Sequence, residues 1–352
     1  MNAGIQLVLP GLFDLPLDEL EPGFLDSALP ELNRLLRFGN PIDNRAFSLD
    51  DSIAGALGLA PIGARLPMAR CFRSETDTDA RLMLAEAIHL RPDMHNAIAM
   101  PIPDEPENQA DLATIMADLA ELFADDFDLL ETGEGAYLLR LRHFDAPQLY
   151  PHPLSVLGKN LSPYVEQSRQ VLPWYKLLNE IQMFLHQHPL NQRRLQNGRL
   201  MINSLWTWGA GEALPRPGQF AWFGDDALCN RFAEDLGAPV ASLQAFAEYQ
   251  GQDPAVVVDL RLLRWLKTGS EQRLDQLLLG IESQLIEPAM TRLLNRLDGI
   301  RLRAGYAVDF ELGKRARYKI WRRHQNLGSW QQGASLPQVD ESAMSAASMP
   351  RD

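Results

Sequence analysis

Short apolar runs alternate with stretches of helical spacing along this chain, which predicts a mixed α/β fold. Residues 5–9 form a short apolar run that ends at Pro10 and Gly11, as a buried central strand does. Residues 255–260 form the clearest second run of this kind, and residues 300–308 are predicted as a late strand. Helices are predicted where leucine and isoleucine recur every three or four residues, at 30–38, 174–190 and 274–297.

The middle of the chain has a strand-helix-strand pattern with short connections, which predicts a smaller α+β domain. Its expected elements are a strand at 96–100, a helix at 111–123 and a strand at 136–141. We therefore assign residues 1–66 and 174–327 to an α/β core and residues 67–173 to an inserted domain. From residue 328 to 352 the periodicity ends and Gln, Ser and Ala accumulate, which predicts a disordered tail.

Composition narrows the functional classes. The 33 basic and 46 acidic side chains give a net charge of −13, which favours solubility and disfavours a nucleic acid as partner. Cys71 and Cys229 are the only cysteines, so neither a disulfide framework nor a thiolate zinc site is expected. The start of the chain lacks a signal-peptide pattern, and no apolar run is long enough for a membrane span. We expect a cytoplasmic protein.

One segment concentrates hydrogen-bond donors. Asn191, Arg194 and Asn203 carry planar donor groups that suit a phosphate or a carboxylate. Gly209 and Gly211 follow a tryptophan-rich strand and would let backbone amides approach a ligand. These five residues are the predicted ligand site. In the competing interpretation the tryptophans are core residues and the glycines form a turn.

The same segment resembles a known enzyme family. The run His188-Pro189-Leu190-Asn191, an Arg three residues later and an Asn before a Gly-x-Gly turn are similar to archaeal-type cofactor-independent phosphoglycerate mutases. Residues 178–215 look even more like RpfE-type regulatory proteins, a bacterial family related to those mutases. The resemblance runs from LVLPGLFDLP over most of the chain. It implies an alkaline-phosphatase-like central sheet with helices on both faces and an inserted α+β domain.

The resemblance also shows what this chain lacks. The enzymes open with strand-Asp-Gly-x-x-Asp-x-Pro, in which the first Asp holds a metal, and here Pro10 takes that place. Proline has no side-chain ligand atom for a cation. The enzymes' hydroxyl nucleophile lies in a Gly-Lys-Thr/Ser-Pro segment, for which this chain offers only Ser27, and a capping role explains that residue.

The histidines do not replace the missing ligands. The enzymes need an Asp-His pair because two divalent ions must lie about 4 Å apart, and this sequence has no Asp-His dipeptide. No histidine occurs between Gly211 and Arg323, where the enzymes keep ligands. His186 and His188 would point about 200° apart on a helix. We predict no metal residues, no catalytic residues and no cofactor.

A basic run near the C-terminus is a further candidate surface. Arg317, Lys319, Arg322 and Arg323 lie within residues 314–323, where basic and aromatic residues are interleaved. Such a run binds an acidic protein partner or phosphates, although a solvated helix or edge strand has the same composition.

These observations lead to one functional prediction with two alternatives. We predict a non-catalytic regulatory or accessory protein on a degenerate phosphoglycerate-mutase-like scaffold, which binds a phosphorylated or carboxylate ligand. The first alternative is a metal-dependent mutase or phosphatase that holds manganese or zinc with Asp14, Asp259, Asp309 and a histidine. The second is a nucleic-acid accessory protein that uses residues 314–323.

Overall fold

The computed structural model divides the described part of the chain into two compact units. It describes residues 4–44, 48–59, 65–93, 96–133, 135–147, 150–161, 164, 169–269, 272–295, 299–305, 307–313 and 325–333. Unit 1 contains the described residues within 4–59 and 215–333, and unit 2 contains those within 65–214. Each unit has its own sheet, and the two are described separately below.

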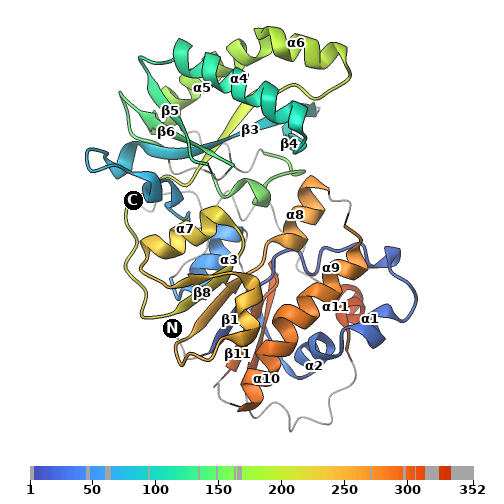
Figure 1. Ribbon diagram of the computed structural model, residues 1–352. Coiled ribbons are helices and arrows are strands. Elements are labelled where there is room, and N and C mark those ends of the chain that lie inside the picture. The colour runs from blue at the N-terminus through green and yellow to red at the C-terminus, as the bar shows by residue number, and fades with distance from the viewer. Residues whose placement is uncertain are drawn as a thin grey trace. The chain divides into compact units, whose positions relative to one another are not determined.

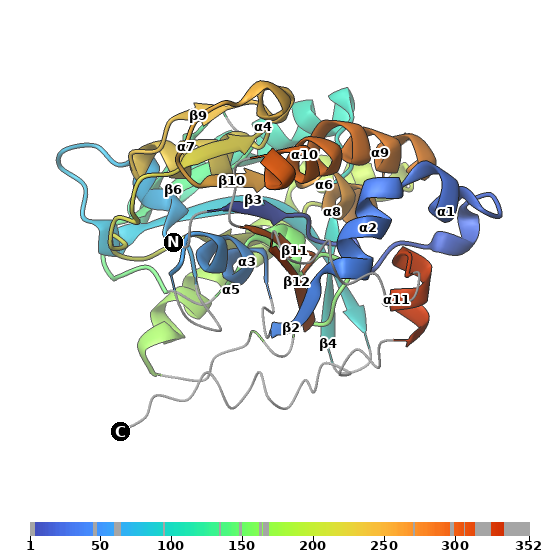
Figure 2. The ribbon, with the colours of Figure 1, turned by 90° about the horizontal axis from the view of Figure 1, so that it is seen from below.

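Unit 1 contains a seven-stranded sheet in the order β2-β12-β11-β1-β10-β8-β9. The strands are β1 (Ile5–Val8), β2 (Asn40–Asn44), β8 (Ala221–Gly224), β9 (Val240–Ala241), β10 (Ala255–Val258), β11 (Gly299–Arg303) and β12 (Ala307–Gly313). β1 lies between β10 and β11 and is parallel to both, and β8 and β9 continue the parallel part. Figure 2 labels β9, β10, β11, β12 and β2 of this sheet. β12 and β2 are antiparallel and close one edge. The predicted central strand is confirmed.

Helices cover both faces of this sheet (Figure 1). They are α1 (Phe24–Ala28), α2 (Pro30–Phe38), α3 (Leu49–Ala56), α7 (Ala227–Asp235), α8 (Arg261–Thr268), α9 (Leu274–Ile281), α10 (Glu287–Asn295) and α11 (Leu327–Gly333), with short helical segments η1 (Leu17–Glu19), η7 (Leu243–Glu248) and the π-helical η8 (Glu282–Ile286). Ile5, Leu7 and Phe223 point into a core shared with α2, α9 and α10. Trp222 points to the opposite face, where it donates a hydrogen bond to Asn230 of α7. The predicted α/β class is therefore confirmed.

Unit 2 is an antiparallel sheet packed against helices. Its strands are β3 (Leu82–Asp93), β4 (Asn96–Pro101), β5 (Phe127–Glu131), β6 (Tyr137–Leu141) and β7 (Ser204–Trp208). Its helices are α4 (Pro106–Leu122), α5 (Leu172–Gln187) and α6 (Pro189–Gln196), with short segments η2 (Met68–Phe72), η3 (Asp79–Arg81), η4 (Pro153–Ser155) and η6 (Arg169–Val171). Trp174 and Ile181 of α5 pack with Ile115 of α4 and Leu139 of β6 in one buried cluster. This is the α+β module that the sequence predicts.

Several predicted boundaries differ from the structure. The second unit extends to Leu214 rather than residue 173, because β7 pairs with β3 and α5 packs into the same core. The helix predicted at 174–190 ends before His188, and the strand predicted at 300–308 is two antiparallel strands joined at Gly305. α11 forms at the start of the segment predicted to be a disordered tail, and residues 334–352 lie outside the described part.

A buried glutamate joins two helices of unit 1. Glu282, in the π-helical segment, accepts the backbone N–H groups of Glu31 at 2.6 Å and Leu32 at 3.1 Å. These are among the first N–H groups of α2, whose own N-cap residue, Leu29, supplies no side-chain acceptor. Burial raises the pKa of Glu282 to about 7, although the two N–H donors act in the opposite direction. Glu282 therefore caps α2 from a distant part of the sequence.

We expect this site to make stability fall with rising pH. The ordinary pKa is 4.5 and the folded value is about 7, so the folded protein holds the proton more tightly. The contribution is complete below the unfolded pKa and is lost as pH rises through the folded pKa. Between pH 5 and 7.5 the wild-type protein should lose about 2 kcal/mol of unfolding free energy relative to Glu282→Gln, measured by urea denaturation.

The matched control is Glu234→Gln, which removes an exposed carboxylate from α7. That variant should follow the wild-type pH profile. Parallel profiles for the wild type and Glu282→Gln would contradict the assignment.

Candidate functional site

The carboxyl ends of the parallel strands in unit 1 carry buried acids. Ligands of open α/β sheets bind at such strand ends, so these acids are the first place to look for chemistry. Asp259 follows β10, and its side chain is inaccessible to solvent. The guanidinium of Arg261 donates from Nε to both carboxylate oxygens at 3.0 Å and from Nη2 to Oδ2 at 2.7 Å. Both oxygens of Asp259 are thus engaged by one arginine.

The carboxylate of Asp259 also affects the pKa of Arg261. Burial acts to lower the pKa of Arg261, but the hydrogen bonds and charge of Asp259 outweigh it, so the pKa is raised. The backbone N–H of Arg261 also donates to Asp259 Oδ1 at 2.9 Å. Asp259 therefore fixes the start of α8 as well as its first side chain.

The acids that follow β8 are held in a similar way. Asp226 is the N-cap of α7: its Oδ1 accepts the N–H of Cys229 at 2.7 Å, and its Oδ2 pairs with Arg264. Asp225 accepts the N–H of Leu243 at 3.1 Å. Burial, together with the charge of Asp226, raises the pKa of the Cys229 thiol well above its ordinary value. Cys229 is therefore held as a thiol, and the acids serve the local structure.

A third buried acid lies on the antiparallel strand β12. Asp309 Oδ2 receives Arg301 Nε at 3.1 Å and Arg303 Nη1 at 2.9 Å. Arg303 also donates from Nη2 to the carbonyl oxygen of Gly55 in α3, at 2.7 Å. Burial lowers the pKa of Arg303 to about 10, and Asp309 acts in the opposite direction. The pair ties β11 and β12 to a covering helix.

The end of the central strand is filled by the chain itself. Pro10 follows β1, and the next residues, Leu12 and Phe13, are buried in the core together with Leu9. A Cβ atom on Gly305 would lie 3.4 Å from the backbone N of Gly11, so the two loops are in close contact. The strand end that would carry the first metal ligand in the resembled enzymes holds packed apolar side chains here.

The acids do not fit manganese or zinc. Divalent ions need several oxygen or nitrogen ligands that are free to coordinate them, and the oxygens of Asp259 already bind Arg261. Asp14, which belongs to the alternative ligand set, is exposed and lies near Lys267. Burial lowers the pKa of Lys267, although the charge of Asp14 acts in the opposite direction. Within the described residues, no three His, Cys, Asp or Glu side chains are grouped so that they could hold a metal ion.

The predicted ligand residues of unit 2 bind the protein's own backbone. Asn191 is fully buried: its Nδ2 donates to the carbonyl oxygens of Leu185 and Ile202, each at 2.7 Å, and its Oδ1 accepts the N–H of Ile202 at 2.8 Å. Asn203 makes the same kind of reciprocal pair with both backbone groups of Leu90, at 2.6 and 2.9 Å. Both amides therefore act as substitutes for backbone pairing.

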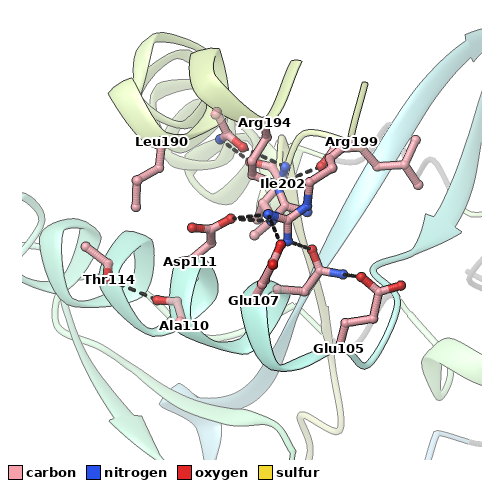
Figure 3. A network of polar contacts seen from close by, with 12 residues as sticks. Glu105, Glu107, Ala110, Asp111, Thr114, Leu190, Arg194, Arg199 and Ile202 are labelled. Atoms are coloured by element: carbon pink, nitrogen blue, oxygen red, sulfur yellow. Dashed lines mark hydrogen bonds and ion pairs between the residues drawn. The ribbon is translucent and has the colours of Figure 1, made fainter. Parts of the chain in front are cut away.

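Arg194 belongs to an ionic network with α4 (Figure 3). Its Nε donates to the carbonyl oxygen of Leu200 at 2.8 Å, and its Nη1 binds Asp111 at 2.8 Å. Arg199 contacts the same Asp111 oxygen at 3.3 Å and extends the network to Glu107 at 3.3 Å and to Asn108. The network fixes the connection between α6 and β7 on the surface of α4.

The two glycines close the strand β7. Gly209 has φ +69°, and its carbonyl oxygen accepts the N–H of Ala69 at 2.9 Å. Gly211 has φ +144°. The structure thus brings Asn191 and Arg194 together on α6, and places Asn203 and the glycines at the two ends of β7. A ligand bound by these five residues stays a prediction.

Two histidines have a role that the sequence reasoning missed. His152 and His188 each accept, through Nδ1, the N–H of the residue two positions later at 3.2 Å, and each precedes a proline that begins a helical turn. His188 Nε2 also lies 3.0 Å from Asp118 Oδ2. The available signal was the tripeptide His-Pro-Leu, which occurs at 152–154 and at 188–190.

Two remaining expectations concern the surface. Ser27 lies in the last turn of α1 and donates to the carbonyl oxygen of Gly23 at 2.9 Å, so the predicted N-capping role is wrong. Arg317, Lys319, Arg322 and Arg323, the predicted partner residues, lie outside the described residues.

Across the described part of the chain, no helix has both the length and the hydropathy to cross a bilayer.

Comparison with known proteins places this chain near phosphoglycerate mutases. No protein-family model matches it. It is 34% identical over 70 residues to a "Probable 2,3-bisphosphoglycerate-independent phosphoglycerate mutase" of Geobacter sulfurreducens. This match covers 20% of this chain and 17% of that protein. It is 31% identical over 61 residues to the 2,3-bisphosphoglycerate-independent phosphoglycerate mutase of Methanosarcina barkeri, and this match covers 17% of this chain and 15% of that protein. These sequence matches support kinship with that enzyme group. They span less than a fifth of each relative.

Two solved structures are similar over most of the chain. The PH0037 protein from Pyrococcus horikoshii superposes with a TM-score of 0.47 and 14% identity, over 89% of this chain and 87% of that one. The cofactor-independent phosphoglycerate mutase from Thermoplasma acidophilum superposes with a TM-score of 0.40 and 16% identity, over 99% and 96%.

The hydrogen bonds of Asn191 predict a structural role that needs no ligand. Asn191→Ala removes three buried hydrogen bonds, two of them to the N–H and carbonyl of Ile202, so we expect a loss of about 3 kcal/mol in unfolding free energy. The neighbouring Gln192→Ala, which removes a single exposed bond to the His186 carbonyl, should cost less than about 1 kcal/mol. Equal losses in urea denaturation of the ligand-free variants would contradict this role.

The Asp259 pair predicts a strong coupling. Arg261→Met leaves a buried carboxylate without its guanidinium, which should destabilise the protein by about 3 kcal/mol. Adding Asp259→Asn should recover much of that loss, because the amide no longer carries a charge. The control is Arg273→Met, which breaks a solvent-exposed pair with Asp275 and should leave the denaturation midpoint unchanged. Additive effects of the two substitutions would argue against the pairing.

Proposed function

We propose that the protein is a non-catalytic regulatory or accessory protein of the RpfE type, built on a phosphoglycerate-mutase-like scaffold. One observation carries the proposal: the buried acids Asp259, Asp226 and Asp309 are each paired with arginine. An acid that is neutralised by a side chain of its own chain is not available to bind a divalent cation. The guanidinium in turn is not available to stabilise a transferring phosphoryl group.

The chemistry of phosphoryl transfer explains why this matters. The reaction depends on cations and donors that stabilise the charge on the transferring group, and on an activated nucleophile. In unit 1, Pro10 stands after the central strand, and Cys229 is held as a buried thiol. The scaffold can be kept for binding while the reaction is lost, because fold and function are separable.

The proposed partner is a protein or a small phosphorylated or carboxylate molecule. The local sequence matches to phosphoglycerate mutases point to a phosphoglycerate as the first small molecule to test. The same matches favour the alternative, a manganese- or zinc-dependent mutase or phosphatase. That alternative requires Arg261 to release Asp259 when the metal binds.

Metal analysis and a turnover assay distinguish the two. We expect purified protein to hold far less than one equivalent of manganese or zinc, and to convert no 3-phosphoglycerate when manganese is added. A chelator should leave the thermal midpoint unchanged, because the arginine pairs rather than a cation neutralise the buried acids.

The cofactor-independent mutase from Thermoplasma acidophilum, assayed in parallel, serves as the positive control for turnover. Stoichiometric metal together with turnover that a chelator abolishes would establish the enzyme and end the proposal. Binding of 3-phosphoglycerate without conversion, measured by calorimetry, would support the accessory role directly.

A further inference from the structure

The C-terminal helix α11 contacts the segment that leaves the central strand of unit 1. Figure 2 shows α11 beside α1 and α2. Leu327 at its start is fully buried in the main core. A Cβ atom on Gly328 would lie 3.2 Å from the side chain of Leu25 and 3.9 Å from that of Leu17. The backbone of α11 therefore rests on the chain between β1 and α2.

One side chain of α11 binds the loop that follows β1. We call residues 9–16 the β1 loop. Gln331 Nε2 donates to the carbonyl oxygens of Phe13 at 2.9 Å and Leu15 at 3.0 Å. Within the loop, the N–H of Asp14 donates to the carbonyl oxygen of Gly11 at 3.0 Å. The Leu15 carbonyl also accepts the N–H of Leu17 at 3.0 Å, so Gln331 is a second donor to that group and joins it to the Phe13 carbonyl of the same loop.

Aromatic contacts connect the same two segments. The rings of Trp330 and Phe310 meet edge to face with centroids 4.7 Å apart. Phe310 in turn lies 5.8 Å from Phe13 of the β1 loop. Trp330, Phe310 and Phe13 thus form a continuous contact from α11 through β12 to the β1 loop.

α11 cannot be stable by itself. It has seven residues, two of them glycine, whereas an isolated helix needs about 12 to 15 residues. Asn326 and Ser329 cap it reciprocally, the N–H of each accepted by the side chain of the other at 2.9 and 2.8 Å. Asn326 Nδ2 also donates to Asp26 of α1 at 2.7 Å. The helix therefore exists because it is docked, and little secondary structure is lost when it leaves.

We propose that α11 is a reversible C-terminal latch for the β1 loop. Docking of α11 and the packed conformation of the loop form one equilibrium, and the seven-stranded sheet stays folded in both states. A partner that captures the C-terminal segment would then loosen the loop at the carboxyl end of β1, where α/β sheets contact ligands. The latch does not depend on the proposed function, because it follows from contacts within unit 1.

Hydrogen exchange on the full chain tests the latch. Leu327→Asp places a charge in the core contact and should release α11. We expect amide exchange in residues 10–17 to rise about tenfold or more, while the amides of β1 and β10 keep their wild-type protection. Gln331→Ala removes only the two bonds to the loop, and should raise exchange severalfold in residues 13–17 while α11 keeps its own protection.

Gln276→Ala, at an exposed position on α9, is the control and should change neither region. The proposal fails if Leu327→Asp exposes α11 but leaves the loop amides protected. It also fails if the strands lose protection together with the loop, because α11 would then belong to the global core. Unchanged exchange in Gln331→Ala would remove Gln331 as the connecting residue and overturn the mechanism.

Discussion

Pairing of buried carboxylates with guanidinium groups is the constraint on which the rest of this structure depends. An unpaired buried charge costs several kcal/mol, so each buried acid must find a cation or many donors. The protein meets this need from its own sequence, with Arg261 for Asp259 and Arg303 for Asp309 in unit 1. In unit 2 the buried member of the pair is the arginine, because Arg194 is 2% exposed and binds the partly exposed Asp111. Each of these pairs therefore neutralises a buried charge with a residue of the same unit.

A second theme is the use of polar side chains as partners for backbone groups where elements meet. Asn191 and Asn203 complete the pairing on either side of the connection into β7, and Glu282 serves the start of α2. His188 and Gln331 do the same at a helix start and at a loop. Residue types that are typical of ligand sites are also the types that suit these junctions. Their presence in a sequence therefore does not by itself distinguish a binding site from a structural joint.

This ambiguity explains which parts of the structure could be predicted from the sequence. The strands at 5–9 and 255–260 and the helix at 30–38 were predictable because apolar residues alone decide them. β3 was missed, since its partly polar sequence LMLAEAIHLRPD lacks a clean alternation and its pairing partners are distant. α11 was missed because its helical state comes from docking. The residues of the candidate site could be named, but not the partners to which their donors are committed.

The position of β1 has a consequence for how the chain is made. Ile5 pairs with Ala255 on one side and Ile300 on the other, so the central strand leaves the ribosome long before either neighbour exists. Unit 2, whose pairings lie within Arg65–Leu214, can complete its sheet during that interval. Until synthesis reaches β11, the apolar β1 remains an unsatisfied segment of the nascent chain, which is the kind of segment that chaperones shield.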